Sequence, residues 1–140
     1  MDILTAEHRH FLLDQVHTGK LATVRKDGRP HVVPVWFDLN GDTLVFNTWH
    51  TTVKAANIRR DPRVCLCVDD EKPPFTYIMI EGLATLLADR DALLHWATRI
   101  AGRYMGTELA EAYGQRNAVE GELLVLVRPT RVVFEKNIAD

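Results

Sequence analysis

Two dipeptides, Asp27-Gly28 and Asn40-Gly41, constrain the fold of this 140-residue chain more than any other feature. Asp-Gly and Asn-Gly favour the two-residue turns of β-hairpins, because the central positions of those turns require a positive φ. Segments of alternating or β-branched residues flank both turns, at residues 20–25, 31–37 and 43–47. The sequence therefore predicts three consecutive antiparallel strands joined by two hairpins, a β-meander.

Further strands are expected later in the chain, with short helices in the connections. The strands cover residues 64–68, 77–87, 123–127 and 131–135, and Gly82 indicates a bulge or bend. Helices are predicted after the N-cap residue Thr5, over residues 53–60, from the N-cap Asp89 to about Gly102, and over 107–115. The early strands lack crossover helices, so a doubly wound parallel sheet is excluded. The pattern favours a mainly β fold with peripheral helices, a small antiparallel barrel whose closure removes exposed edges.

Pro34 interrupts the second predicted strand. Proline has no backbone N–H and therefore cannot donate to a neighbouring strand. Within a sheet it is confined to an edge, a bulge or a gap that faces a ligand. We take this position as the first indication of a binding site.

Composition places the chain among ordinary folded domains. With 46% hydrophobic residues, 26% charged residues and a net charge of −2, it resembles a globular protein and not a disordered segment. Its length suits one domain spanning residues 1–140. No basic run is present, which argues against a nucleic-acid partner. No segment has the length and apolar character of a membrane span or a secretory signal, so a cytoplasmic protein is expected.

The sequence contains none of the spacings that mark metal or hydrolytic sites. Its six histidines show no ligand spacing, and Cys65 and Cys67 have no second pair to complete a zinc site. The two cysteines are expected to be reduced, small core residues. Phosphate-binding loops, dinucleotide fingerprints and nucleophile elbows are also missing. We therefore expect no metal and assign no catalytic side chain.

Residues 47–57 form the most informative stretch. Hydroxyl side chains precede a predicted helix, and Lys54 lies in its first turn. The positive end of the helix dipole, N–H groups and an ammonium together suit a phosphate. The alternative is that Thr51 or Thr52 only caps the helix and that Lys54 is solvated.

The order of several segments resembles the split barrels of the pyridoxamine-5'-phosphate-oxidase-like family. The segments are Leu21-Ala22-Thr23-Val24, residues 27–37 from Asp27-Gly28 to Trp36-Phe37, and residues 52–64 from Thr52-Val53-Lys54 to Val64. The resemblance continues through Glu81-Gly82 into the terminal strands. It is strongest to the actinobacterial branch of probable deazaflavin-dependent (F420-dependent) oxidoreductases.

This resemblance implies a homodimer that binds two cofactors across its subunit interface. The second strand would run beside the cofactor ring system, Lys54 would contact the cofactor phosphate, and polar neighbours would complete the pocket. The cofactor-binding residues implied are His31, Val33, Pro34, Trp36, Asn47, Thr48, Thr51, Lys54 and Asn57. Trp49 and Thr52 depart from some relatives, which carry a small residue or an arginine there. Trp96, Ile100 and parts of the terminal strands are expected at the dimer interface, and the alternative for Trp96 is that it packs its own helix onto its own barrel.

The function expected from the resemblance is an F420-dependent oxidoreductase that transfers hydride between the deazaflavin and a conjugated acceptor of the enone or quinone type. The cofactor carries the chemistry, while the protein orients it and excludes competing reactions. Trp36 would form a wall of the substrate side. One alternative is an FMN-dependent oxidoreductase of the same fold. Another is a non-catalytic module that binds flavin or haem, because one fold can carry unrelated functions.

Overall fold

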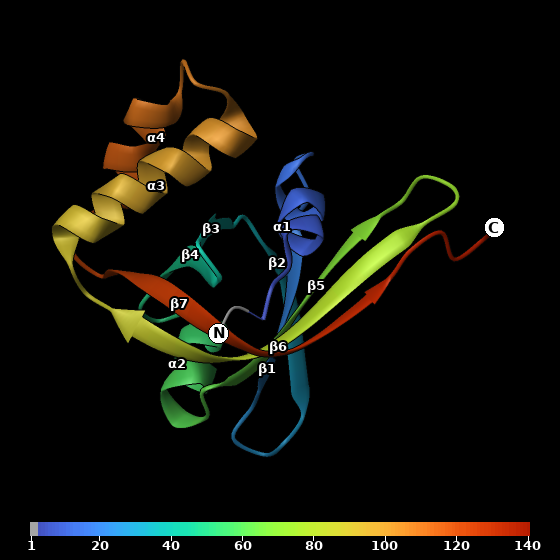
Figure 1. Ribbon diagram of the computed structural model, residues 1–140. Helices are drawn as coiled ribbons and strands as arrows, with labels where there is room; N and C mark the ends of the chain where they lie inside the picture. The colour runs from blue at the N-terminus through green and yellow to red at the C-terminus, as the bar shows by residue number, and fades with distance from the viewer. Residues whose placement is uncertain (1–2) are drawn as a thin grey trace.

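The computed structural model describes residues 3–140, which form a seven-stranded antiparallel sheet with helices around it (Figure 1). The strands are β1 (Gly19–Val24), β2 (Pro30–Val35), β3 (Asp38–Asn40), β4 (Thr43–Trp49), β5 (Arg63–Asp70), β6 (Thr76–Leu87) and β7 (Glu122–Glu135). The helices are α1 (Ala6–Leu13), α2 (Val53–Arg60), α3 (Arg90–Met105) and α4 (Ala110–Asn117). The predicted mainly β class and split-barrel architecture are confirmed.

The predicted meander is wrong at its second step. The strand order is β2-β1-β5-β6-β7-β4-β3, so both predicted hairpins form, but they lie at opposite ends of the sheet. The chain leaves the sheet at Phe37, where the backbone N–H donates to the Tyr104 hydroxyl at 3.1 Å and the carbonyl accepts from Arg103. Because α3 satisfies these backbone groups, strand β2 ends there and β4 pairs with β7 instead.

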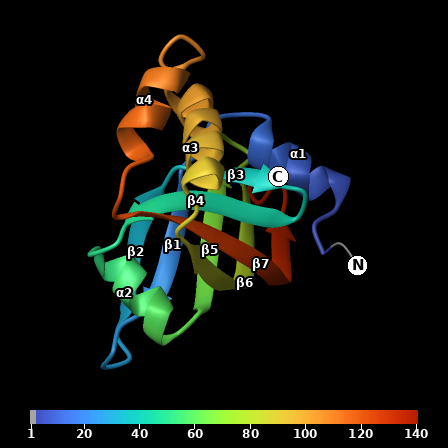
Figure 2. The same cartoon turned by 90° about the vertical axis from the view of Figure 1, so that its left-hand side faces the viewer.

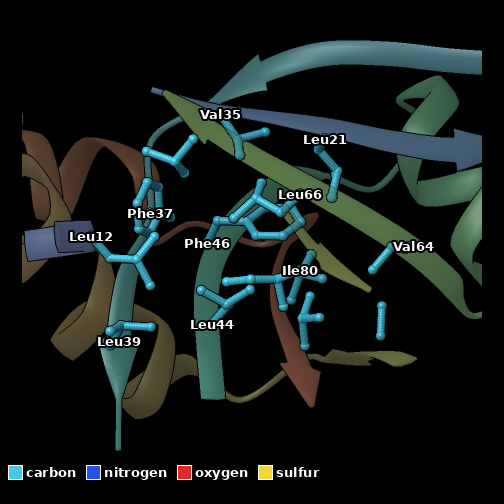
Figure 3. Close-up of a cluster of buried hydrophobic side chains, with 14 of the residues drawn as sticks. Leu12, Leu21, Val35, Phe37, Leu39, Leu44, Phe46, Val64, Leu66 and Ile80 are labelled. Carbon is cyan, nitrogen blue, oxygen red and sulfur yellow. The ribbon is translucent and has the colours of Figure 1, made fainter. Parts of the chain in front are cut away.

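The curled sheet encloses one main hydrophobic core. Side chains from the strands at both ends of the order, Val35 of β2 and Leu39 of β3, meet in it with Ile80 of the central strand β6 (Figure 3). Helix α1 adds Leu12 to this core, and its predicted N-cap Thr5 accepts from the His8 N–H at 3.1 Å. Helices α3 and α4 pack as a pair to one side of the barrel (Figures 1 and 2).

The β6–β7 ladder contains the bulge that Gly82 indicated. The register shifts between Glu81 and Gly82, where Gly82 pairs with Pro129 and Glu81 pairs with Arg131. Pro129 has no backbone N–H to donate to β6, and the bulge accommodates it without ending the strand. The two predicted terminal strands are therefore one continuous strand, β7. A Cβ at position 82 would lie 2.6 Å from Val127 Cγ1 and 2.7 Å from the Arg128 carbonyl oxygen.

Gly82→Ala should therefore destabilise the protein by about 1–3 kcal/mol, the usual cost of forcing an extra methyl group into a packed site. Gly102→Ala is the matched control, because a Cβ there meets only Ala110 Cβ at 3.4 Å. That exchange in the middle of α3 should stabilise by about 0.5–1 kcal/mol through its helix propensity. Chemical denaturation measures both variants, and equal effects at the two glycines would contradict the proposed close approach.

Helix α3 is longer than predicted and ends at Met105, because Gly106 adopts a φ of 95° and Gly102 does not stop the helix. Asp89 is its N-cap, as expected, and accepts from the Ala92 N–H. Ile100 is buried within the subunit, and Trp96 packs on a small cluster with Val45 and Leu124. The structure thus contains the packing of Trp96 on its own barrel, and the place of these residues in a dimer interface stays a prediction.

The two cysteines differ from expectation in their position. They are free, but Val64, Leu66 and Val68 fill the core-facing side of β5, which leaves Cys65 and Cys67 half-buried on the outer face of the sheet. Burial raises the pKa of both thiols. Within residues 3–140, no helix combines the length and apolar character needed to cross a membrane.

Candidate functional site

A pocket of about 280 Å³ lies where the barrel is split, between edge strand β2 and strand β4. Its walls come from four elements that are far apart in sequence. Lining residues are Pro34, Val35 and Trp36 at the end of β2, Asn47 on β4, Lys54 on α2 and Asn117 at the end of α4. Pro34 pairs only with Lys20 of β1, so its missing N–H falls on the open edge of the sheet. The gap that Pro34 indicated is therefore a pocket.

The Trp36 indole forms the aromatic wall of this pocket and is held in place by α3. Its ring stacks on Tyr104 with centroids 5.0 Å apart and an interplanar angle of 6°. The Tyr104 hydroxyl accepts from the Phe37 N–H and donates to the His17 carbonyl at 2.6 Å. Trp36 itself is 40% exposed. An indole with one supported face and one open face provides a flat surface for a ring system.

Lys54 supplies the cation of the pocket. Its side chain is half-buried, and this burial lowers the pKa of the ammonium, whereas the nearby Glu122 carboxylate raises it. Burial also raises the pKa of the Glu122 carboxyl, while the nearby Asn47 side chain and the charge of Lys54 lower it. The lysine is thus not a freely solvated surface residue. Asn47 lines the same pocket as Lys54, and the charge of Glu122 acts on the lysine.

The hydroxyl groups before α2 serve mainly to build the turn. Thr52 is the N-cap and accepts from the Ala55 N–H at 3.2 Å. Its hydroxyl also lies 2.8 Å from that of Thr48, which is buried. Thr51 is exposed at the surface. These contacts fix the first turn of α2, and with it the direction of the Lys54 side chain.

The remaining predicted residues lie outside the pocket lining. Asn57 is buried and donates to the Thr23 hydroxyl at 2.9 Å, while its side-chain oxygen accepts from Arg60. His31 and Val33 are partly buried further along β2. The His31 Nδ1 atom is buried without a hydrogen-bond partner in the structure. A ligand group that reached along β2 would satisfy this nitrogen.

The structure thus gathers four of the nine predicted residues, Pro34, Trp36, Asn47 and Lys54, around one pocket. It adds Val35, Asn117 and the neighbouring Glu122, and it shows that Tyr104 supports the aromatic wall. No local pattern marks these additions except for Val35, which adjoins Pro34. They reach the site only through the pairing of β4 with β7 and the packing of α3 and α4.

The donor set fits a cofactor with a planar ring and an anionic tail. An indole face and an apolar strand end border one part of the pocket, and an ammonium with two carboxamides borders the other. Among the described residues, no group of three His, Cys, Asp or Glu side chains could hold a metal ion. The fold and this pocket define a split-barrel protein of the flavin-binding type.

The sequence profile of the pyridoxamine 5'-phosphate oxidase family matches residues 4–136. The chain therefore belongs to this family, whose members bind flavin-type cofactors. A search of curated protein sequences finds no match to the chain.

Solved structures share the fold over nearly the whole chain. A conserved hypothetical protein, Rv2991 of Mycobacterium tuberculosis, superposes with a TM-score of 0.82 at 23% identity, covering 97% of this chain and 87% of that one. A structure described as an F420 reductase gives a TM-score of 0.69 at 28% identity, covering 89% and 94%. HutZ, the haem storage protein of Vibrio cholerae, gives a TM-score of 0.71 at 19% identity, covering 95% of this chain and 94% of that one. At this level of identity the likeness shows the fold alone.

Proposed function

We propose that this protein is an F420-dependent oxidoreductase that transfers hydride between the deazaflavin and a conjugated acceptor of the enone or quinone type. The observation that carries the proposal is the meeting of Trp36, Pro34 and Lys54 around one pocket in the split of the barrel. The likeness to a structure described as an F420 reductase, at 28% identity over 89% of this chain, supports the choice of cofactor.

In this proposal the protein binds and orients, while bound F420 supplies a ring carbon that accepts or gives a hydride. Lys54 and the first turn of α2 hold the phosphate. The open edge of β2 borders the ring system, and Trp36 walls the substrate side with its supported indole. No side chain that lines the pocket is an evident acid, and the proton comes from solvent or from a nearby polar group.

Titration of the purified protein with F420, FMN and haemin in parallel tests the cofactor assignment. We expect saturable binding of F420 with the highest affinity of the three. FMN is included because its phosphate suits the same lysine. Haemin is included because a non-catalytic haem module shares the fold. Tighter binding of FMN or haemin than of F420 would redirect the proposal to that ligand.

We further propose that two copies of the chain associate through the outer face of the sheet. Side chains alternate along each strand, so this face carries Val32 of β2, Ala22 of β1 and Cys65 of β5 as neighbours. Val32 is 64% exposed, and a shallow hollow lined by Ala22, Pro30 and Cys65, with the charged Arg63 and Glu81, lies on the neighbouring strands. Small apolar residues on an open sheet face suit burial against a second copy.

Sedimentation at micromolar concentration should find a dimer, and Val32→Arg should weaken it, because a charge would be buried without a partner. Val16→Arg is the control, since Val16 is similarly exposed, at 57%, but lies in the segment between α1 and β1 and not on a strand of this face. We expect the dissociation constant to rise by about tenfold or more for Val32→Arg only. A parent protein that sediments as a stable monomer would contradict the dimer.

A further inference from the structure

A hollow of about 560 Å³ lies on the helical side of the molecule, between the end of α1 and the pair of helices α3 and α4 (Figures 1 and 2). It shares no lining residue with the pocket in the split of the barrel. Its charged residues are Asp38 at the start of β3 and Arg99 and Arg103 on α3, and its apolar residues include Leu13 and Ala110. The function proposed above uses none of these side chains.

Asp38 is a buried carboxylate, with 3% of its surface exposed. Its Oδ1 atom accepts from the Leu39 N–H at 2.8 Å and lies 4.0 Å from Arg103 Nη1. The same guanidinium donates to the carbonyl groups of Phe37 and Leu12. Arg103 therefore serves the fold, because it offsets a buried charge and joins α3 to α1 and to the crossing between β2 and β3.

Arg99 differs from Arg103 in how few of its donors are used. Its Nε atom donates to Asp38 Oδ2 at 3.4 Å, and its guanidinium lies over the Trp96 ring, 5.4 Å from the centroid. Within residues 3–140, neither of its Nη groups has a hydrogen-bond partner, and the side chain is 54% exposed. Arg99 is thus oriented by a buried carboxylate and by an indole, while its terminal donors stay open.

We propose that this hollow binds a small carboxylic acid with an apolar body, through the Nη groups of Arg99. An oriented guanidinium offers two N–H donors that match the two oxygens of a carboxylate. Two guanidinium groups and one carboxylate line the hollow, which leaves one positive charge for a singly charged anion. Leu13, at 40% exposure, and Ala110 suit the apolar body of the ligand. This inference goes beyond the proposed function and does not depend on it.

Benzoate is the probe, because it joins one carboxylate to a flat apolar body. It is titrated into the purified protein, and backbone amide shifts are followed in ¹H–¹⁵N NMR spectra. We expect saturable shifts at Thr98, Gly102 and Ala110, which line the hollow. Benzyl alcohol keeps the ring without the charge and should give no saturable shift there. If benzoate gives none either, the contact between Arg99 and Asp38 is purely structural and the inference is overturned.

Variants of Arg99 assign the binding to this residue. Arg99→Gln should weaken benzoate binding by about tenfold or more, the loss of a hydrogen bond to a charged group. Arg99→Lys keeps a cation beside Asp38, which preserves the fold, and should weaken binding by a smaller factor because an ammonium does not match both oxygens. Arg90→Gln is the matched control, since Arg90 is an exposed arginine at the start of the same helix. It should leave the affinity unchanged.

Lys54→Ala distinguishes this site from the pocket in the split of the barrel. We expect it to leave benzoate affinity unchanged. If benzoate affinity fell in Lys54→Ala and not in the Arg99 variants, the carboxylate would be bound in that pocket, and the inference about the hollow would be wrong while the proposed function stood.

Discussion

Phe37→Ala is expected to lower the free energy of unfolding by about 3–5 kcal/mol, the cost of deleting a buried aromatic ring. The Phe37 ring is fully buried where the chain crosses from β2 to β3, and the Arg103 guanidinium lies over it, 5.3 Å from its centroid. Removal of the ring would leave a cavity between the barrel core and α3. Denaturant titration followed by circular dichroism measures the change.

The neighbouring aromatic residue provides the control. Trp36 is 40% exposed and its main aromatic contact is the stacked Tyr104 ring, so Trp36→Ala should cost only about 0.5–1.5 kcal/mol. Phe37→Leu should lie between the two, since it keeps most of the buried volume. If Trp36→Ala destabilised the protein as much as Phe37→Ala, our distinction between a core ring and a pocket wall would be wrong.

Lys54→Ala should raise the dissociation constant of F420 by about tenfold to a hundredfold, which is the loss of a hydrogen bond to a charged group. Turnover at saturating F420 should change much less than affinity, since the phosphate lies far from the reacting ring carbon.

Two further variants separate this role from a general effect of charge. Lys54→Arg should rescue binding only in part, because a planar guanidinium does not replace a compact ammonium. Lys72→Ala removes the same charge from the exposed loop between β5 and β6, on the far side of the molecule from α2, and should leave binding unchanged (Figure 1). If Lys54→Ala bound F420 with a free energy within about 0.5 kcal/mol of the parent value, the role of Lys54 in phosphate binding would be contradicted.

Local signals were sufficient for most elements of the fold. The turns at Gly28 and Gly41 adopt φ values of 88° and 60°, and both hairpins form around them. The bulge at Gly82 also follows from the sequence. The meander was wrong because the backbone of Phe37 bonds to Tyr104 and Arg103, more than sixty residues away. No sequence pattern near Phe37 predicts that its backbone bonds to these two residues.

The same difference between local signals and distant contacts applies to the residues of the candidate site. Pro34 and Lys54 carry their own chemical signals, a missing N–H and a cation in the first turn of a helix, and both line the pocket. Glu122 and Asn117 carry none, since each is an ordinary polar residue until β7 and α4 bring it beside β4. The family resemblance implied that Asn57 lies in or beside the same pocket as Lys54. In the structure its side-chain amide donates a hydrogen bond to the buried Thr23 hydroxyl, a contact that the sequence does not indicate.

The most direct test of the account is hydride transfer itself. Reduced F420 is mixed anaerobically with a small quinone, with and without the protein, and the return of the oxidised deazaflavin absorbance is followed. We predict that the parent protein accelerates the reoxidation far above the rate in buffer, and that Lys54→Ala at subsaturating F420 falls well below the parent. Reoxidation by the parent at the rate of buffer alone, for quinone and enone acceptors alike, would contradict the claim that this split barrel is an F420-dependent oxidoreductase.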